Sequence, residues 1–183
     1  MSLVFILLVI ICVIAVYVFS TYNTLVRLRN LVKEGFSTMD IYLKKRWDLI
    51  PNLVETVKGY AKHEGELLEK VTQLRSGSYD NMSMESKIDV NNELSRGISK
   101  IIAVAENYPD LKANQNFMSL SQELTKIETD IANSRKYYNG TARQFNNKVQ
   151  MFPSNIIANS FGFKEVNMFE ASAEERENVK VEF

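Results

Sequence analysis

The sequence predicts an all-α protein, in which a single N-terminal transmembrane helix continues into an elongated antiparallel up-down bundle of four helices. Three observations support this fold class. The chain begins with a long apolar run that carries no charge. Apolar residues in the rest of the chain recur at spacings of three and four, which is the period of a helix. The 183 residues include only 7 Gly and 3 Pro, too few for a β-rich fold with many tight turns.

The apolar run, Leu3 to Phe19, predicts a membrane anchor over residues 1–22. At a rise of about 1.5 Å per residue it covers roughly 25 Å, and its flanking residues extend it to the roughly 30 Å of a bilayer core. A cleaved signal peptide is one alternative, but no Lys or Arg precedes Arg27 and no A-x-A pattern follows the run. A buried core helix is the other, but the run is apolar on every face.

The distribution of charge predicts the orientation of this anchor. Six basic residues follow the span within a short distance: Arg27, Arg29, Lys33, Lys44, Lys45 and Arg46. By the positive-inside rule the N-terminus lies outside and the large C-terminal part lies in the cytoplasm. Tyr17, Phe19 and Tyr22 are placed at the inner membrane interface, and Arg27 and Arg29 are placed to touch lipid head groups. The Lys44–Arg46 group is expected at a solvated end of the bundle, beyond a Debye length from the membrane.

Composition argues against several classes of function. With 22 basic and 22 acidic residues, no net charge draws the chain to nucleic acid. The single Cys12 lies in the apolar run, and the single His63 cannot complete an H-E-x-x-H zinc motif or a di-iron site. The usual phosphate-binding and nucleophile-elbow motifs are absent from the sequence. We therefore expect no enzyme activity, cofactor, metal or small-molecule substrate.

The anchor helix is predicted to continue to Trp47 without a break. Residues 21–47 contain no Pro, and one apolar stripe follows them, formed by Leu25, Leu28, Val32, Phe36, Met39, Leu43 and Trp47. Pro51 then suggests a new start, because proline is tolerated in the first turn of a helix and Asp48 is a good N-cap. Asp48, Pro51 and Asn52 are thus the candidate corner between two helices. The alternative is one long helix kinked at Pro51, which gives a bundle of three helices.

Further helices are predicted over residues 49–75, 83–107 and from 114 to about 150, so that the cytoplasmic bundle covers residues 23–151. Turn residues separate them: Ser76 to Asn81 in one case, and Tyr108, Pro109 and Asp110 in the other.

A C-terminal tail, residues 152–183, is predicted to follow the bundle. Phe152, Pro153, Asn155 and Ile156 form its candidate contact segment, which could pack on the bundle, on a neighbouring subunit or in the membrane interface. Four antiparallel helices bring the tail back to the membrane, whereas an unbroken first helix directs it away. From Lys164 onward the chain is charged and is expected to be loosely held.

Two separated blocks of sequence resemble bacterial LemA family proteins. The first spans Tyr22 to Glu64 and centres on KRWDLIPNLVE, residues 45–55. The second runs from Tyr138 through FPSNIIA, residues 152–158, to FGF at 161–163 and FEA at 169–171. The resemblance implies a single-pass protein of the bacterial inner membrane with a helical-bundle domain, and it implies no established enzymatic activity.

The sequence leaves three hypotheses for function. The first is a membrane-anchored scaffold with long helices of the coiled-coil type, which forms a homo-oligomer or recruits membrane-protein partners through its bundle and tail surfaces. The second is an adaptor for another membrane system, such as quality control or envelope stress. The third, an undetected enzyme or transporter subunit, is the least favoured, because the span carries no ionisable residue that could line a path. In each case the lipid bilayer is the expected partner.

Overall fold

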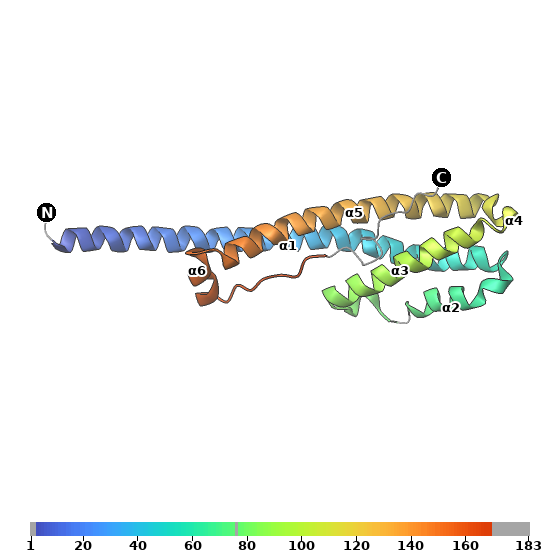
Figure 1. The fold of residues 1–183 in the computed structure, drawn as a ribbon, viewed down its shortest axis with the longest axis horizontal. Coiled ribbons are helices and arrows are strands. Elements are labelled where there is room, and N and C mark those ends of the chain that lie inside the picture. Colours follow the sequence, from blue (N-terminus) through green and yellow to red (C-terminus); the bar gives the residue numbers. More distant parts are fainter. Residues whose placement is uncertain (1–2, 76, 170–183) are drawn as a thin grey trace, which may run out of the picture. The chain divides into compact units, whose positions relative to one another are not determined.

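The computed structural model describes residues 3–75 and 77–169, and over these residues the chain is helical with no strand (Figure 1). The predicted all-α class is therefore confirmed. The α-helices are α1 (Leu3–Lys58), α2 (Gly65–Gln73), α3 (Met84–Ala105), α4 (Pro109–Lys112), α5 (Gln115–Gln150) and α6 (Ser154–Ser160). Two short 3-10 helices, Lys62–Glu64 and Tyr79–Asn81, lie in the connections.

The chain divides into two compact units. The terminal unit comprises Met1–Ser37 and Ser134–Phe183, and the central unit comprises Thr38–Asn133. Helices α1 and α5 each contribute one part to each unit. The first part of α1 is long and apolar enough to cross a membrane, and none of that stretch is buried.

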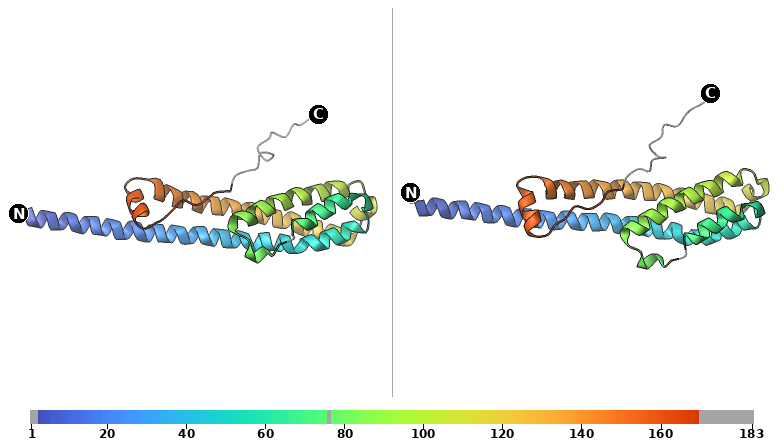
Figure 2. Two further views of the ribbon diagram at one scale, coloured as in Figure 1. Left: turned by 90° about the horizontal axis from the view of Figure 1, so that it is seen from below. Right: turned by 60° about the horizontal axis from the view of Figure 1, so that its bottom comes forward.

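In the terminal unit, α5 runs beside α1 in the opposite direction (Figures 1 and 2). The two helices approach closely at Gly35, where an added Cβ would lie 3.3 Å from the Cα of Tyr138. The buried apolar side chains of this unit are Leu25, Leu28, Val32, Tyr138, Ala142, Phe145, Val149, Ile157, Ala158 and Phe163. Leu25, Leu28 and Val32 of the predicted stripe are thus confirmed as core, and Phe36 of the same stripe is half-buried.

In the central unit, α2 packs on α3 (Figure 2). Gly97 of α3 meets Val71 of α2, and a Cβ at Gly97 would lie only 2.6 Å from Cγ2 of that valine. The remaining part of α1 and the first part of α5 complete the core of this unit. Its buried apolar side chains, from all five α-helices, include Met39, Leu43, Trp47, Ile50, Leu53, Val57, Leu68, Val71, Leu94, Ile98, Ile101, Leu111, Phe117, Leu124, Ile127 and Ile131.

The helix break expected before Pro51 is wrong, because α1 continues through Pro51 and ends at Lys58. A proline inside a helix costs about 3 kcal/mol through a lost hydrogen bond and a steric clash. The proline ring lies on the exposed face, whereas Ile50 and Leu53 on either side are fully buried. One uninterrupted helix keeps these side chains on the same buried face, and burial of each large apolar side chain contributes about 1.5–3 kcal/mol. Burial along the stripe therefore outweighs the cost of the proline.

Asp48, Pro51 and Asn52 consequently do not form a corner, and all three are exposed on α1. The Asp48 carboxylate accepts a hydrogen bond from Nζ of Lys44 at 2.7 Å, one turn earlier, instead of capping a helix. The backbone carbonyl of Asn52 accepts a hydrogen bond from the hydroxyl of Thr56 at 2.7 Å.

The end of α1 lies instead after Lys58, where the backbone amides of Tyr60 and Ala61 both donate to the carbonyl of Val57. The helix predicted over 49–75 is thus divided into the end of α1 and the nine residues of α2. The helices predicted from 83 and from 114 correspond to α3 and α5. Their starts are capped by Ser83, whose hydroxyl accepts from the Ser86 amide, and by Asn114, whose Oδ1 accepts from the Phe117 amide.

Candidate functional site

The turn between α5 and α6 places the predicted contact segment at one end of the terminal unit. Ser154 is buried there, and its hydroxyl donates to the carbonyls of Lys148 and Met151 at 2.7 and 2.8 Å. The Phe152–Pro153 peptide bond in this turn is cis. These bonds fix the direction of α6, whose inner face buries Ile157 and Ala158.

The opposite face of this turn carries large apolar side chains in solvent. Met151 is 62% exposed, Phe152 79%, Ile156 57% and Phe161 55%. We name these four residues, together with the exposed Pro153, the apolar corner. Asn155, the remaining residue of the predicted contact segment, is half-buried, and its Oδ1 has no hydrogen-bond partner in the described part of the chain.

The apolar corner packs against α1 just after the apolar run. The ring centroids of Tyr22 and Phe161 are 4.9 Å apart, and those of Tyr22 and Phe163 are 5.7 Å apart. The expectation that an unbroken first helix directs the tail away from the anchor is therefore wrong. It failed because α1 ends at Lys58 and the separate helix α2 adds one more pass before α3 and α5 (Figure 1).

The predicted membrane-interface residues lie along α1 beside this corner. Tyr17, Phe19, Tyr22, Arg27 and Arg29 are all exposed. The guanidinium carbon of Arg29 lies 5.2 Å from the centroid of the Phe163 ring, so this arginine contacts the segment that follows α6 as well as facing solvent.

An extended segment, residues 164–169, runs back along α5; we name it the strap. Nδ2 of Asn146 donates to the carbonyl of Val166 at 2.8 Å, and its Oδ1 accepts from the Val166 amide at 2.9 Å. Asn139 makes the same pair of bonds with Phe169, at 2.8 and 2.9 Å. The Tyr138 hydroxyl donates to the carbonyl of Asn167 at 2.8 Å.

The loosely held tail expected from Lys164 is therefore wrong for residues 164–169, and residues 170–183 lie outside the described residues. The sequence did not predict a role for Asn139 and Asn146, because each side-chain amide forms its hydrogen bonds with the backbone of a segment that is distant in the chain. The available signal was their spacing of seven residues, which is about two helical turns and places both on one face of α5.

Arg46 is fully buried in the central unit, so its expected place among solvated basic residues is wrong. Its Nη2 donates to Oδ1 and to the backbone carbonyl of Asn91 at 2.9 and 2.8 Å. Its Nη1 donates to Ser95 Oγ at 2.6 Å and to Glu128 Oε2 at 2.5 Å. A buried guanidinium is tolerated when its donors are satisfied in this way, and the cluster ties α1 to α3 and α5.

A second polar cluster in the central unit surrounds Tyr79. The Tyr79 hydroxyl donates to Oδ1 of Asp40 at 2.7 Å, and Nζ of Lys87 lies 2.9 Å from Oδ2 of the same carboxylate. Burial, the hydrogen bond to Asp40 and the negative charge of Asp40 raise the pKa of Tyr79 well above its usual 10.0. The ring also packs against Trp47, with centroids 5.3 Å apart. These contacts place Tyr79 in a structural role.

Side chains suited to metal binding do not gather in the part of the chain that the structure describes: it contains no group of three or more His, Cys, Asp or Glu that could hold an ion. His63 is exposed and lies in the 3-10 helix Lys62–Glu64 that follows α1.

The fold and these sites define a class: an all-helical protein with a candidate N-terminal membrane helix and an apolar corner beside it. Residues 35–183 match the LemA family, and the chain belongs to that family. Protein LemA of Metamycoplasma hominis is 29% identical over 86% of this chain and 72% of its own length. Magnetosome protein MamQ of Magnetospirillum gryphiswaldense is 20% identical, and Magnetosome protein MamQ 1 of Paramagnetospirillum magneticum is 22% identical; this chain spans 64% of the length of each.

Proposed function

We propose that this protein is a membrane-anchored helical scaffold that self-associates or organises partner proteins at the cytoplasmic face of the membrane. The observation that carries the proposal is the continuity of α1. One helix, Leu3–Lys58, begins with an exposed apolar segment and then contributes buried side chains to both packed units. The candidate anchor is thus part of the same continuous helix that packs in the terminal unit.

The proposed orientation has the N-terminus outside and the C-terminal domain in the cytoplasm. It rests on the basic residues Arg27, Arg29 and Lys33, which follow the apolar segment, and on the absence of basic residues from the sequence before Arg27. Fusion of green fluorescent protein to the C-terminus should give fluorescent cells, whereas alkaline phosphatase at the same position should be inactive. The reverse pattern would overturn the orientation.

The scaffold proposal is tested by the mass of the full-length protein extracted in mild detergent. Mass photometry and single-particle images of the same sample should give a discrete particle of several subunits. A monomer that co-purifies with one stoichiometric membrane protein would instead favour an adaptor. A monomer without any partner, also after cross-linking in the native membrane, would contradict both.

A further inference from the structure

The terminal unit carries an apolar surface that its own core does not use. Met151, Phe152, Ile156 and Phe161 are each more than half exposed, while the neighbouring Ile157 and Ala158 fill the interior. The hydrogen bonds of the buried Ser154 hold α6 in a fixed direction, so the same face of α6 always points outward. Contiguous exposed apolar side chains of this size mark a surface that meets another apolar phase.

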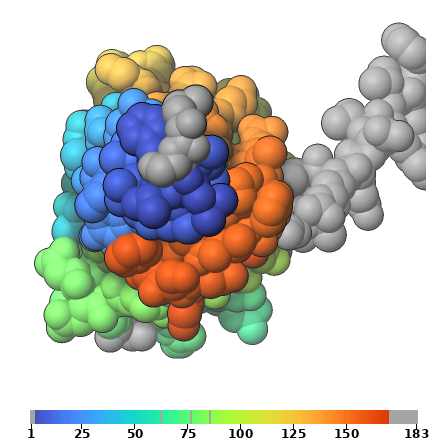
Figure 3. All heavy atoms as spheres, turned by 90° about the vertical axis from the view of Figure 1, so that its left-hand side faces the viewer, coloured from blue at the N-terminus to red at the C-terminus, as the bar shows by residue number. Residues whose placement is uncertain are grey.

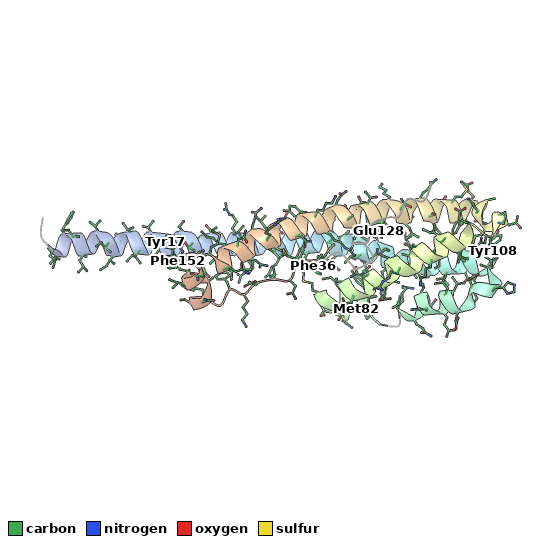
Figure 4. The ribbon with its side chains drawn as sticks, in the orientation of Figure 1. Tyr17, Phe36, Met82, Tyr108, Glu128 and Phe152 are labelled. Atoms are coloured by element: carbon green, nitrogen blue, oxygen red, sulfur yellow. The ribbon has the colours of Figure 1, made fainter. Side chains whose placement is uncertain are left out.

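The position of this apolar surface indicates that the apolar phase it meets is the lipid bilayer. Phe161 contacts Tyr22 with a centroid distance of 4.9 Å. Tyr22 lies three residues after Phe19, the end of the apolar run, which is about 4.5 Å along a helix. The head-group layer on each side of a bilayer is roughly 5–8 Å thick. In Figure 4, Tyr17 and Phe152 are labelled at the same level along α1, and Figure 3, which looks along α1 from its N-terminal end, shows atoms of the red C-terminal segment at the surface on one side of this helix.

The charges around the corner match an anionic lipid surface. In the sequence, residues 20–33 carry Arg27, Arg29 and Lys33 and no acidic residue. Residues 144–165, which contain the corner, carry Lys148, Lys164 and the single acidic Glu165. Basic side chains next to an apolar face favour binding to the interface of membranes that contain anionic lipids.

We infer that the apolar corner is a second membrane contact, which inserts Phe152, Ile156 and Phe161 into the head-group and acyl boundary of an anionic bilayer next to the spanning part of α1. This inference rests on the proposed membrane anchoring. It gives α6 a function that is distinct from self-association. The terminal unit contacts the membrane at two places, the spanning part of α1 and the apolar corner. The second contact fixes the rotation of α1 about its own axis, which a single span leaves free.

The test uses the full-length protein in vesicles of mixed anionic and zwitterionic lipid, with an environment-sensitive fluorophore attached to one cysteine at a time. Phe152→Cys and Ile156→Cys, each in a Cys12→Ser background, report on the corner. Gln144→Cys is the matched control, because Gln144 is exposed on α5 about 10 Å before the corner. Two corner positions are used because a change at Phe152 alters the turn itself.

We expect a blue-shifted emission at positions 152 and 156, a loss of fluorescence when the lipids carry a nitroxide on the upper acyl chain, and protection from aqueous iodide. At position 144 the emission should not be blue-shifted, the lipid nitroxide should not quench the fluorescence, and aqueous iodide should quench it. Replacing the anionic lipid by zwitterionic lipid should reduce the quenching at the corner. Equal exposure to iodide at all three positions would overturn the inference, and so would protection from iodide without quenching by the lipid label, which means that a protein covers the corner.

The native Cys12 separates this inference from the anchoring on which it rests. Cys12 lies in the middle of the apolar run and is exposed. A fluorophore at Cys12 should be quenched by a nitroxide deep in the acyl chain. Quenching at Cys12 without quenching at 152 and 156 would overturn the second contact alone. No quenching at Cys12 would overturn both.

Discussion

Nη1 of Arg46 lies 2.5 Å from Oε2 of Glu128, although 82 residues separate them in the chain. The arginine side chain is completely buried, whereas that of the glutamate is 49% exposed. Water therefore screens the carboxylate, while the buried Asn91 and the partly buried Ser95 satisfy other donors of the guanidinium. This arrangement makes Arg46 the residue on which the packing of α1, α3 and α5 in the central unit depends.

Replacing Arg46 should destabilise the central unit strongly. We expect Arg46→Met to lower the free energy of unfolding by about 3 kcal/mol, because Asn91 loses its partner at a buried site and the bonds to Ser95 and Glu128 are lost as well. Glu128→Gln should cost about 1 kcal/mol, since a neutral acceptor remains. Urea denaturation of the full-length protein in detergent, followed by circular dichroism, measures both. The control is Lys45→Met at an exposed neighbour, which should change stability by less than about 0.5 kcal/mol. A similar loss of stability in Arg46→Met and Lys45→Met would contradict the role of Arg46.

The raised pKa of Tyr79 predicts a stability difference that depends on alkaline pH. Burial, above all, and Asp40 raise the pKa of the folded state above 10.0, so the stabilisation is complete below about 10 and is lost as pH rises. At pH 8, Tyr79→Phe should be less stable than the wild type by about 1 kcal/mol, through the lost hydrogen bond. Between pH 10 and 11 this difference should shrink by up to about 1.4 kcal/mol. Urea denaturation at several pH values checks this, and a constant difference would refute it.

Loss of Asn146 should release the strap. Asn146→Ala removes both hydrogen bonds to Val166, at a cost of about 1–2 kcal/mol. Trypsin should then cleave after Lys164 several-fold faster than in the wild type, as followed by mass spectrometry. Asn147→Ala, at the exposed adjacent position, is the matched control. If cleavage is equally fast in both variants, the amide pair does not hold the strap.

Pro51 should be a destabilising residue in α1. Because it interrupts the hydrogen bonds of a continuous helix, Pro51→Ala should stabilise the protein by about 1–3 kcal/mol. Asp48→Ala should change stability by less than about 0.5 kcal/mol, since the pair with Lys44 is exposed. Thermal melting of the two variants tests this. Destabilisation by Pro51→Ala and a loss of about 1 kcal/mol for Asp48→Ala would instead support a capped corner.

Two glycines in helices should respond to alanine in opposite directions. A Cβ at Gly97 would lie 2.6 Å from Val71 Cγ2, so Gly97→Ala should lose about 1–3 kcal/mol by overpacking. Around Gly140 of α5 a Cβ meets nothing within 4 Å, so Gly140→Ala should gain about 0.5–1 kcal/mol from helix propensity. Parallel thermal melts give the comparison, and equal shifts would show that the contact between α2 and α3 is looser than described.

Much of the fold follows from local pattern. The apolar run at the start of α1, the stripe from Leu25 to Trp47 and the caps at Ser83 and Asn114 depend on residues within a few turns of each other. Such signals are visible in the sequence, because helical periodicity and capping are properties of neighbouring residues. The candidate sites were harder to predict. Phe152, Pro153 and Ile156 could be selected as unusually apolar, but their place beside Tyr22 depends on how many helices precede them.

By itself, the sequence determined the helical class, the candidate membrane helix and the family-specific segments around Pro51 and Phe152. Only the tertiary structure decided that α1 continues through Pro51, that Arg46 is buried, and that Asn139 and Asn146 hold the strap. The physical reason is the same in each case. The outcome is a balance between a local preference of a few kcal/mol and contacts with segments far away in the chain, and those contacts exist only once the helices have packed.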